Sequence, residues 1–257
     1  MDDVTKKHVK DIEWIRELLS GMDDIAHPIM GIRDWDDAAC IKFSGKLLAS
    51  TDGPYCKRLV MKSALIHAST DVVVKGGRPL FALDNVIGPM ADVRQMMESL
   101  KAQALAMGIP ILGGNTFIDD ESEPLAAITV IGELLIDEPI RDSTSKEGDV
   151  IALLGPPLWG EQEERVKMAK NMFETWHEAI KKVKIHAAKD VTKGGLVSVV
   201  YEMERKCGHR FALEDLKLHM TRNLDNFIAT LSEYEYVSLE GVCARHKCPL
   251  TRIGRVC

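Results

Sequence analysis

The chain has 257 residues, of which 46% are hydrophobic and 28% charged, and its formal net charge is −6. This size and composition predict a soluble, cytoplasmic protein with two domains or one large domain. No run of residues approaches the roughly 18 to 20 apolar residues of a membrane helix, and the charged start MDDVTKKHVKDIEW is unlike a secretory signal. The negative charge argues against nonspecific nucleic-acid binding, which needs a basic surface.

The first half of the chain alternates between predicted helices and strands. Apolar residues at helical spacing, bounded by glycine or proline, predict helices at residues 5–20, 57–74 and 91–107. Runs rich in apolar and β-branched residues predict strands at residues 80–87, 109–112 and 125–135. Residues 38–43 and 46–51 flank Ser44-Gly45 and predict a hairpin whose second strand ends at Asp52-Gly53-Pro54.

The second half begins with a predicted strand at residues 150–154, and Gly155-Pro156-Pro157 then interrupts the chain. We therefore expect a domain boundary there, giving domains at residues 1–154 and 155–257. Further helices are predicted at residues 161–183, 194–207 and 224–231, and short strand-like pieces follow Tyr234.

The six cysteines form no CxxC pair, which favours reduced thiols. Cys243, His246, Cys248 and Cys257 are an alternative zinc site, but they lack the paired spacing of structural zinc sites.

Acidic or amide side chains stand beside glycines at the ends of predicted elements. They are Asp36, Asp37, Asp52, Asp71 and Asn115. Magnesium prefers such hard oxygen ligands and keeps water and substrate phosphates in its remaining positions. The pattern predicts a magnesium site that would let an acidic protein bind a nucleotide. His67, four residues before Asp71, is either a metal or proton-relay partner or a packed core residue, and packing is favoured.

Glycine pairs at 76–77, 113–114 and 194–195 leave room for the backbone to approach a phosphate, although glycine pairs alone are weak evidence. Neither a P-loop nor a GxGxxG dinucleotide motif occurs. In the segment 190–196, DVTKGGL, Thr192 is predicted to cap the following helix, whose amino terminus and Lys193 would face an anion. Capping without any ligand is the alternative. His186 is interpreted as an ordinary strand-edge residue.

Five motifs follow one another in a fixed order: DDAA at 36–39, STDG at 50–53, STDVVVKGGRP at 69–79, GGNT at 113–116 and DVTKGGL at 190–196. In order and spacing they resemble the motifs of the aminoimidazole ribonucleotide synthetase (PurM-like) superfamily. Its members include thiamine-monophosphate kinase, selenophosphate synthetase and the hydrogenase maturation factor that dehydrates a carbamoyl group, and all of these use ATP.

This resemblance implies an α/β (α+β) fold. The first domain would be a mixed sheet with two helices on one side, which pairs into a barrel-like homodimer, and the second domain would be abbreviated. The implied cofactors are ATP and Mg²⁺, and the implied activity is phosphoryl transfer from ATP to activate a small-molecule acceptor.

The resemblance also implies roles for individual residues. The implied magnesium ligands are Asp36, Asp37, Asp52 and Asp71. The implied nucleotide-binding residues are Gly76, Gly77, Gly113, Gly114, Asn115, Thr116 and Gly194. Asp190 and Lys193 would orient the phosphate or the acceptor.

Three departures from the family pattern favour an alternative. Trp35 replaces the glycine that often precedes the aspartate pair, Asn115 replaces a common aspartate or histidine, and few residues follow Gly155. A nucleotide-binding regulatory or scaffold protein with little or no turnover is therefore the second hypothesis. The sequence leaves the acceptor open.

Overall fold

In the computed structural model, residues 13–29, 31–34, 40–214 and 220–257 are described. The chain divides into two compact units, one of residues 1–68 and 79–132, the other of residues 69–78 and 133–257. The boundary at residue 155 follows a strand of the second unit, and the assignment of domains at that point stays a prediction. No helix in the described ranges is long and apolar enough to cross a membrane.

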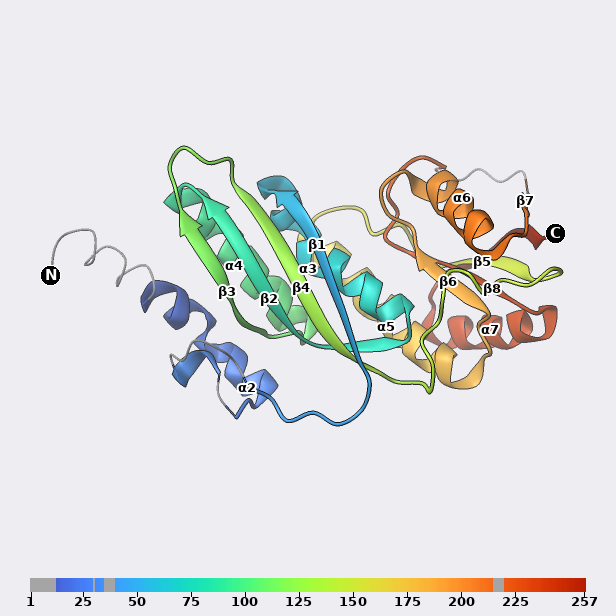
Figure 1. The fold of residues 1–257 in the computed structure, drawn as a ribbon, viewed down its shortest axis with the longest axis horizontal. Helices are drawn as coiled ribbons and strands as arrows, with labels where there is room; N and C mark the ends of the chain where they lie inside the picture. Colours follow the sequence, from blue (N-terminus) through green and yellow to red (C-terminus); the bar gives the residue numbers. More distant parts are fainter. Residues whose placement is uncertain (1–12, 30, 35–39, 215–219) are drawn as a thin grey trace, which may run out of the picture. The chain divides into compact units, whose positions relative to one another are not determined.

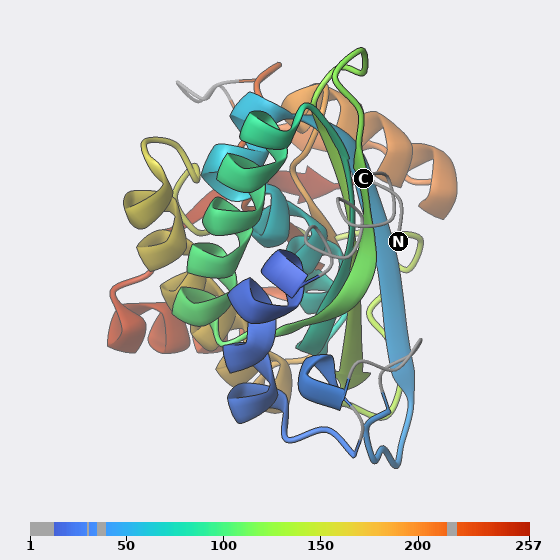
Figure 2. The ribbon, with the colours of Figure 1, turned by 90° about the vertical axis from the view of Figure 1, so that its left-hand side faces the viewer.

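The first unit contains a four-stranded sheet with the order β1-β4-β2-β3 (Figure 1). Its strands are β1 (Leu47–Cys56), β2 (Gly77–Gly88), β3 (Ile111–Ile118) and β4 (Leu125–Leu134). β2 and β3 are parallel and are joined through α4 (Met90–Met107), as a crossover between parallel strands requires. α4 and α3 (Lys57–Val74) cover one face of the sheet, as predicted (Figure 2).

Buried polar contacts fix α3 against α4. The Gln103 side-chain amide donates to the Val60 carbonyl and accepts from the Leu65 backbone N–H, at 2.8 and 3.1 Å. Because Gln103 is fully buried, both hydrogen bonds are made away from water. Short helical segments precede the sheet: residues 13–19, Ser20–Met22, α2 (Asp23–Ala26) and Ile32–Asp34. The predicted first helix is thus observed from residue 13 onward.

The second unit contains a five-stranded sheet with the order β6-β8-β5-β9-β7. Its strands are β5 (Val150–Leu154), β6 (Ala187–Asp190), β7 (Phe211–Leu213), β8 (Phe227–Leu231) and β9 (Leu250–Val256). Each strand pairs antiparallel with its neighbours. The helices are α5 (Gln162–Lys182), α6 (Gly195–Cys207) and α7 (Glu233–His246).

Helices cover β8 from both faces. Phe227 is fully buried and meets the Trp176 ring of α5 edge-on, with ring centroids 5.3 Å apart. The next residue, Ile228, lies in the cluster that also contains Leu196 and Val199 of α6. Successive strand residues point to opposite faces, so every side chain of this strand is buried.

Three predicted elements differ from the structure, one entirely and two in part. Residues 224–231 were expected to be helical, but they contain β8, whose continuous apolar run lacks the alternation of a half-buried strand. The strand-like pieces after Tyr234 are confirmed in part, since β9 is a strand, but the residues before it form α7, which begins after Ser232, whose hydroxyl accepts the Glu235 N–H. Of the expected hairpin, β1 alone is a full strand: it begins at Leu47 and continues through Asp52-Gly53-Pro54. Residues 38 and 39 lie outside the described part.

Candidate functional site

Asp52 lies on β1 and is held by its own neighbours. One carboxylate oxygen accepts the Gly53 N–H at 2.7 Å, and the other accepts the Tyr55 hydroxyl at 2.5 Å. The buried Tyr55 ring stacks on the His67 ring, with centroids 5.7 Å apart. His67 is itself buried, in agreement with a packing role. These contacts orient the half-buried Asp52 carboxylate, and each oxygen retains a lone pair for a further ligand.

The GGNT segment, residues 113–116, lies on β3 and pairs in parallel with β2. Gly114 stands opposite Asp84, and a Cβ at position 114 would lie 2.0 Å from the Asp84 carboxylate oxygen Oδ1. Asp84 therefore occupies the space that a side chain at position 114 would need. The close approach accounts for glycine at 114 whether or not a phosphate binds there.

Asp84 is a charged residue that we did not predict as part of a site. It is 3% exposed, and its Oδ2 atom has no hydrogen-bond partner in the described chain. Burial raises the pKa of Asp84 to about 7. The one sequence signal is the polar pair Asp84-Asn85 inside the otherwise apolar run Leu80 to Ile87.

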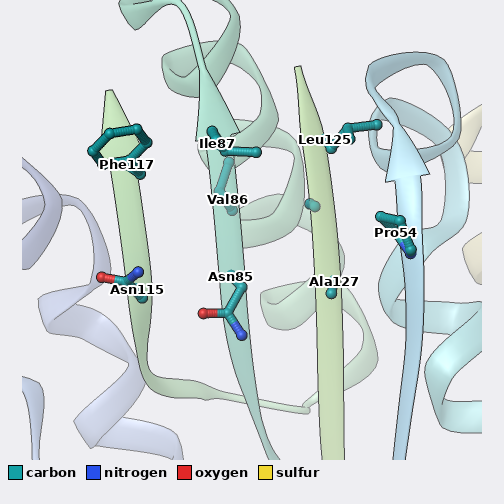
Figure 3. A pocket seen from close by; sticks show the side chains of 9 residues that line it. Pro54, Asn85, Val86, Ile87, Asn115, Phe117, Leu125 and Ala127 are labelled. Atoms are coloured by element: carbon teal, nitrogen blue, oxygen red, sulfur yellow. The ribbon is translucent and has the colours of Figure 1, made fainter. Parts of the chain in front are cut away.

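Two hollows adjoin the GGNT segment. A cavity of 930 Å³ is lined by Gly113, Gly114 and Thr116 together with Asp84 and Asn85, and residues of the first helical segments close it from another side. A smaller, mostly apolar pocket of 370 Å³ lies on the face of the sheet opposite the helices (Figure 3). Asn85 and Asn115, which are paired across β2 and β3, line this second pocket next to Phe117.

In the second unit, Asp190 ends β6 and faces the last turns of α3. The Thr70 hydroxyl donates to its carboxylate at 3.0 Å. Burial, and after it the neighbouring carboxylate of Asp71, raise the pKa of Asp190 to about 6. The structure thus brings together two of the predicted residues, Asp71 and Asp190. A second carboxylate beside the buried Asp190 carboxyl favours a nearby cation, which would offset the repulsion between the two groups.

Lys75 fixes this end of α3 to β6. Its ammonium donates to the Ala188 carbonyl at 2.7 Å and pairs with Asp142. Burial lowers the pKa of Lys75, while Lys75 and two further lysines lower the pKa of Asp142 to about 2, against the opposing effect of its own burial. Because Lys75 is one helical turn after Asp71, and Ala188 is two residues before Asp190, this contact keeps the two aspartates in place.

The loop after β6 differs from its predicted form. Gly194, with φ of 88°, is the N-cap of α6, and no side chain caps this helix. The predicted cap Thr192 instead offers its backbone carbonyl to the Gly195 N–H, because a tight turn occupies residues 192–195. A Cβ at Gly195 would lie 2.6 Å from the Met220 carbonyl oxygen. Lys193 is exposed, and its ammonium has no partner in the described ranges.

Two further glycines predicted to bind nucleotide, Gly76 and Gly77, form hydrogen bonds within the protein. Gly76, with φ of 92°, accepts the Leu135 N–H through its carbonyl, and the Gly77 carbonyl accepts a hydrogen bond from the His177 ring at 2.8 Å. Asp36, Asp37 and Trp35 lie outside the described residues.

The donor set fits magnesium bound together with a nucleotide. Within the described residues, no three acidic, histidine or cysteine side chains are grouped closely enough to hold a metal ion. Magnesium, however, is usually held by one or two carboxylates, with phosphates and water completing its shell. Asp52, and separately Asp71 with Asp190, supply carboxylates of this kind.

Comparison with known proteins places the chain in a family. Residues 35–134 match the model of the AIR synthase related protein N-terminal domain, and residues 124–257 match that of the C-terminal domain. An uncharacterized protein of Methanocaldococcus jannaschii, MJ0799, is 33% identical, over 97% of this chain and 85% of its own length.

Two further similarities come from better known proteins. Selenide, water dikinase of Caldanaerobacter subterraneus is 30% identical over 77% of this chain, which spans 61% of the length of that relative. The fold is that of hydrogenase maturation protein HypE, solved in complex with ATP, with a TM-score of 0.74 at 19% identity over 93% of this chain and 85% of that one. The chain belongs to the AIR synthase related protein family.

Proposed function

We propose that this protein binds ATP with Mg²⁺ and uses the terminal phosphoryl group to activate a small-molecule acceptor. The observation that supports this most is the 930 Å³ cavity beside Gly113, Gly114 and Thr116, the segment that the motif comparison relates to nucleotide binding. Its volume lies within the range of about 300 to 1,000 Å³ that is typical of small-molecule sites. The solved complex of HypE with ATP agrees with this assignment.

The proposed roles follow from the chemistry of the side chains. Asp52 and Asp71, with Asp36 and Asp37 outside the described part, are the proposed magnesium ligands. The metal, when bound, neutralises phosphate charge in an otherwise acidic protein. Asp190, whose pKa is raised by burial to about 6, and Lys193, whose ammonium has no partner among the described residues, would orient the phosphate or the acceptor.

The remaining proposed nucleotide contacts are backbone and amide groups. Asn115 offers a neutral amide oxygen, whereas an aspartate at this position would add a negative charge. It lies next to Asn85 on the exposed face of the sheet. Gly76, Gly77 and Gly194 keep their proposed roles, although each is already engaged in a turn or a protein hydrogen bond.

We also propose that the protein is a homodimer. Phe117, on β3, is 56% exposed and lines the apolar pocket together with Ile87 and Leu125. Leu47, on the edge strand β1, is 53% exposed. Exposed apolar surface of this kind is costly in water, and covering it with the same face of a second copy would remove that cost.

Isothermal titration calorimetry of the full chain with ATP, in magnesium and in EDTA, tests the binding proposal. We expect binding that requires magnesium, and a loss of about tenfold or more in affinity for Asp52→Asn, which corresponds to about 1.4 kcal/mol. Asp120→Asn is the matched control, because Asp120 is exposed and forms no ion pair with any residue that the structure describes. Equal affinities of the two variants would refute the role of Asp52.

Turnover separates the enzyme from the alternative, a nucleotide-binding scaffold. The neutral Asn115 favours that alternative, since it supplies less negative charge to a metal than aspartate does. Release of ADP in the presence of a metabolite mixture, with mass spectrometry of the phosphorylated product, would establish the enzyme. Tight binding of ATP without ADP release in any mixture would favour the scaffold.

A further inference from the structure

A third hollow, of 430 Å³, lies within the second unit and contains none of the motif residues. It is formed by the segment between β4 and β5, the carboxyl end of α5 and the residues that lead into β6. Its apolar lining is supplied by Ile136, Pro139, Ile140, Ile180, Val183 and Ile185. Its polar lining is supplied by Glu138, Arg141, Thr144, Lys184 and His186.

His186 is held in a fixed orientation at this pocket. Its Nδ1 atom lies 2.8 and 2.9 Å from the two carboxylate oxygens of Asp149, and because a carboxylate only accepts, Nδ1–H donates. Asp149 also accepts the Lys146 N–H at 2.9 Å, and its side chain is 4% exposed. The Thr144 hydroxyl donates to the His186 carbonyl at 2.5 Å. Both the ring and its backbone are therefore fixed.

The second ring nitrogen, Nε2, is left for another partner. No residue in the described part of the chain bonds to it, and the ring is 12% exposed. A carboxylate on Nδ1 fixes the orientation of the ring and leaves Nε2 as the nitrogen available to a ligand. Packing alone would not require an imidazole oriented in this way.

Two unpaired cations lie beside this histidine. Arg141 and Lys184 are exposed, and among the described residues neither side chain has an acidic partner. By contrast, the nearby Lys182 pairs with Glu178 at 2.7 Å. Among the lining residues Arg141 and Lys184 outnumber the one carboxylate, Glu138. The Glu235 carboxylate, outside the lining, accepts the Lys184 backbone N–H at 3.1 Å and leaves the Lys184 ammonium without an acidic partner among the described residues.

We propose that this pocket binds a small organic anion, a carboxylate or a phosphate monoester with an apolar body. The isoleucines contact the apolar body, while Arg141 and Lys184 contact the anionic group. The Nε2 atom of His186 hydrogen-bonds to the same group, as acceptor from a hydroxyl when the ring is neutral and as donor when it is protonated. Asp149 is the positioning residue. This site is additional to the proposed nucleotide site.

Ligand-detected NMR titrations of the full chain test this with phenyl phosphate, phenylacetate and benzyl alcohol, which share an aromatic body and differ in the head group. We expect both anions to bind at least about tenfold more tightly than the neutral alcohol. The tighter of the two anions identifies the head group as phosphate or carboxylate. Affinities equal to that of benzyl alcohol would overturn the proposal.

Substitution of the charged lining residues tests whether the anion binds in this pocket. Arg141→Gln and Lys184→Gln should each weaken binding of the tighter anion about three- to tenfold, as expected for loss of one partly exposed charge contact. Lys181→Gln removes the same charge from the exposed side of α5, outside the pocket, and should change the affinity less than twofold. Equal losses in all three variants would show a general effect of charge and would overturn the site.

His186→Gln supplies a second readout, because glutamine keeps a polar group without the ring. The variant should bind both anions more weakly while its far-UV circular dichroism and melting temperature stay near those of the parent. Unchanged affinity in a folded His186→Gln variant would overturn the role of the histidine. If this variant does not fold, the arginine and lysine variants still decide whether the pocket binds anions.

Discussion

Replacing Asp84 by asparagine should change how stability depends on pH. The buried carboxyl has a pKa of about 7, against 3.8 for an exposed aspartate. A raised pKa means that the folded state holds the proton more tightly than the unfolded state does. The contribution of Asp84 to stability is therefore fully present below about pH 4, and it is lost as the pH rises through 7.

The magnitude follows from the linkage relation. From pH 5 until the pH approaches 7, the folded protein is mostly protonated at Asp84 while the unfolded chain is ionised, so each pH unit costs about 1.4 kcal/mol, and the cost per unit falls above that pH. The parent protein should thus lose about 3 kcal/mol more stability between pH 5 and pH 8 than Asp84→Asn does. The side-chain amide of the introduced asparagine brings N–H donors into the same buried position. Asp84→Asn can therefore be less stable than the parent at pH 5 even though its stability depends less on pH.

Urea denaturation followed by far-UV circular dichroism at pH 5, 6, 7 and 8 measures this difference. Asp120→Asn, an exposed aspartate in the same unit, should give a profile parallel to that of the parent. Parallel profiles for the parent and Asp84→Asn, within about 0.5 kcal/mol, would refute the conclusion that Asp84 is buried without a compensating partner.

Three further changes test other parts of the structure. Lys75→Met should destabilise the protein by about 1 to 3 kcal/mol, measured by urea denaturation, because it removes a partly buried ion pair and a hydrogen bond to β6. Gly114→Ala should cost at least about 2 kcal/mol by the same method, since the added Cβ would overlap the backbone and side chain of Asp84. Gly21→Ala is the control: a Cβ at Gly21 would have no atom within 4 Å, so this variant should be neutral or stabilising. Cys243, buried and with its pKa raised by burial to about 12, should resist a thiol reagent at pH 8 that labels the exposed Cys56.

Specific outcomes would contradict these expectations. Unchanged stability of Lys75→Met would show that the contact between α3 and β6 contributes nothing. Equal effects of alanine at the two glycines would contradict the close approach of β2 and β3 at residue 114. Labelling of Cys243 at the rate of Cys56 in the folded protein would place that thiol at the surface.

The first half of the fold could be predicted because local signals agree with one another there. Pro89 and Gly108 bound α4, and helical spacing of apolar residues predicts its length. Near the end of the chain the local sequence signals do not agree with one another. β8 is buried on both faces, so its sequence FIATL has no alternation, and α7 contains aromatic and β-branched residues that also favour strands.

The candidate site could also be predicted only in part from the sequence. Asp71 and Asp190 could be picked out from the motifs, but their proximity depends on contacts between distant segments. Thr70 meets Asp190 from 120 residues away, and Lys75 meets Ala188 from 113. No local pattern predicts such pairs. Asp84 was missed for a related reason: its close contact with Gly114 of β3 depends on strand pairing, whereas in the sequence it is one acidic residue in a strand.

The proposed magnesium and ATP site can be tested most directly by crystallography of the protein with Mn²⁺ and a non-hydrolysable ATP analogue. We predict an anomalous Mn²⁺ peak within coordination distance of the Asp52 or the Asp71 carboxylate and of the nucleotide phosphates. A bound nucleotide whose metal touches neither aspartate, or crystals in which neither analogue nor metal binds at saturating concentration, would contradict the account.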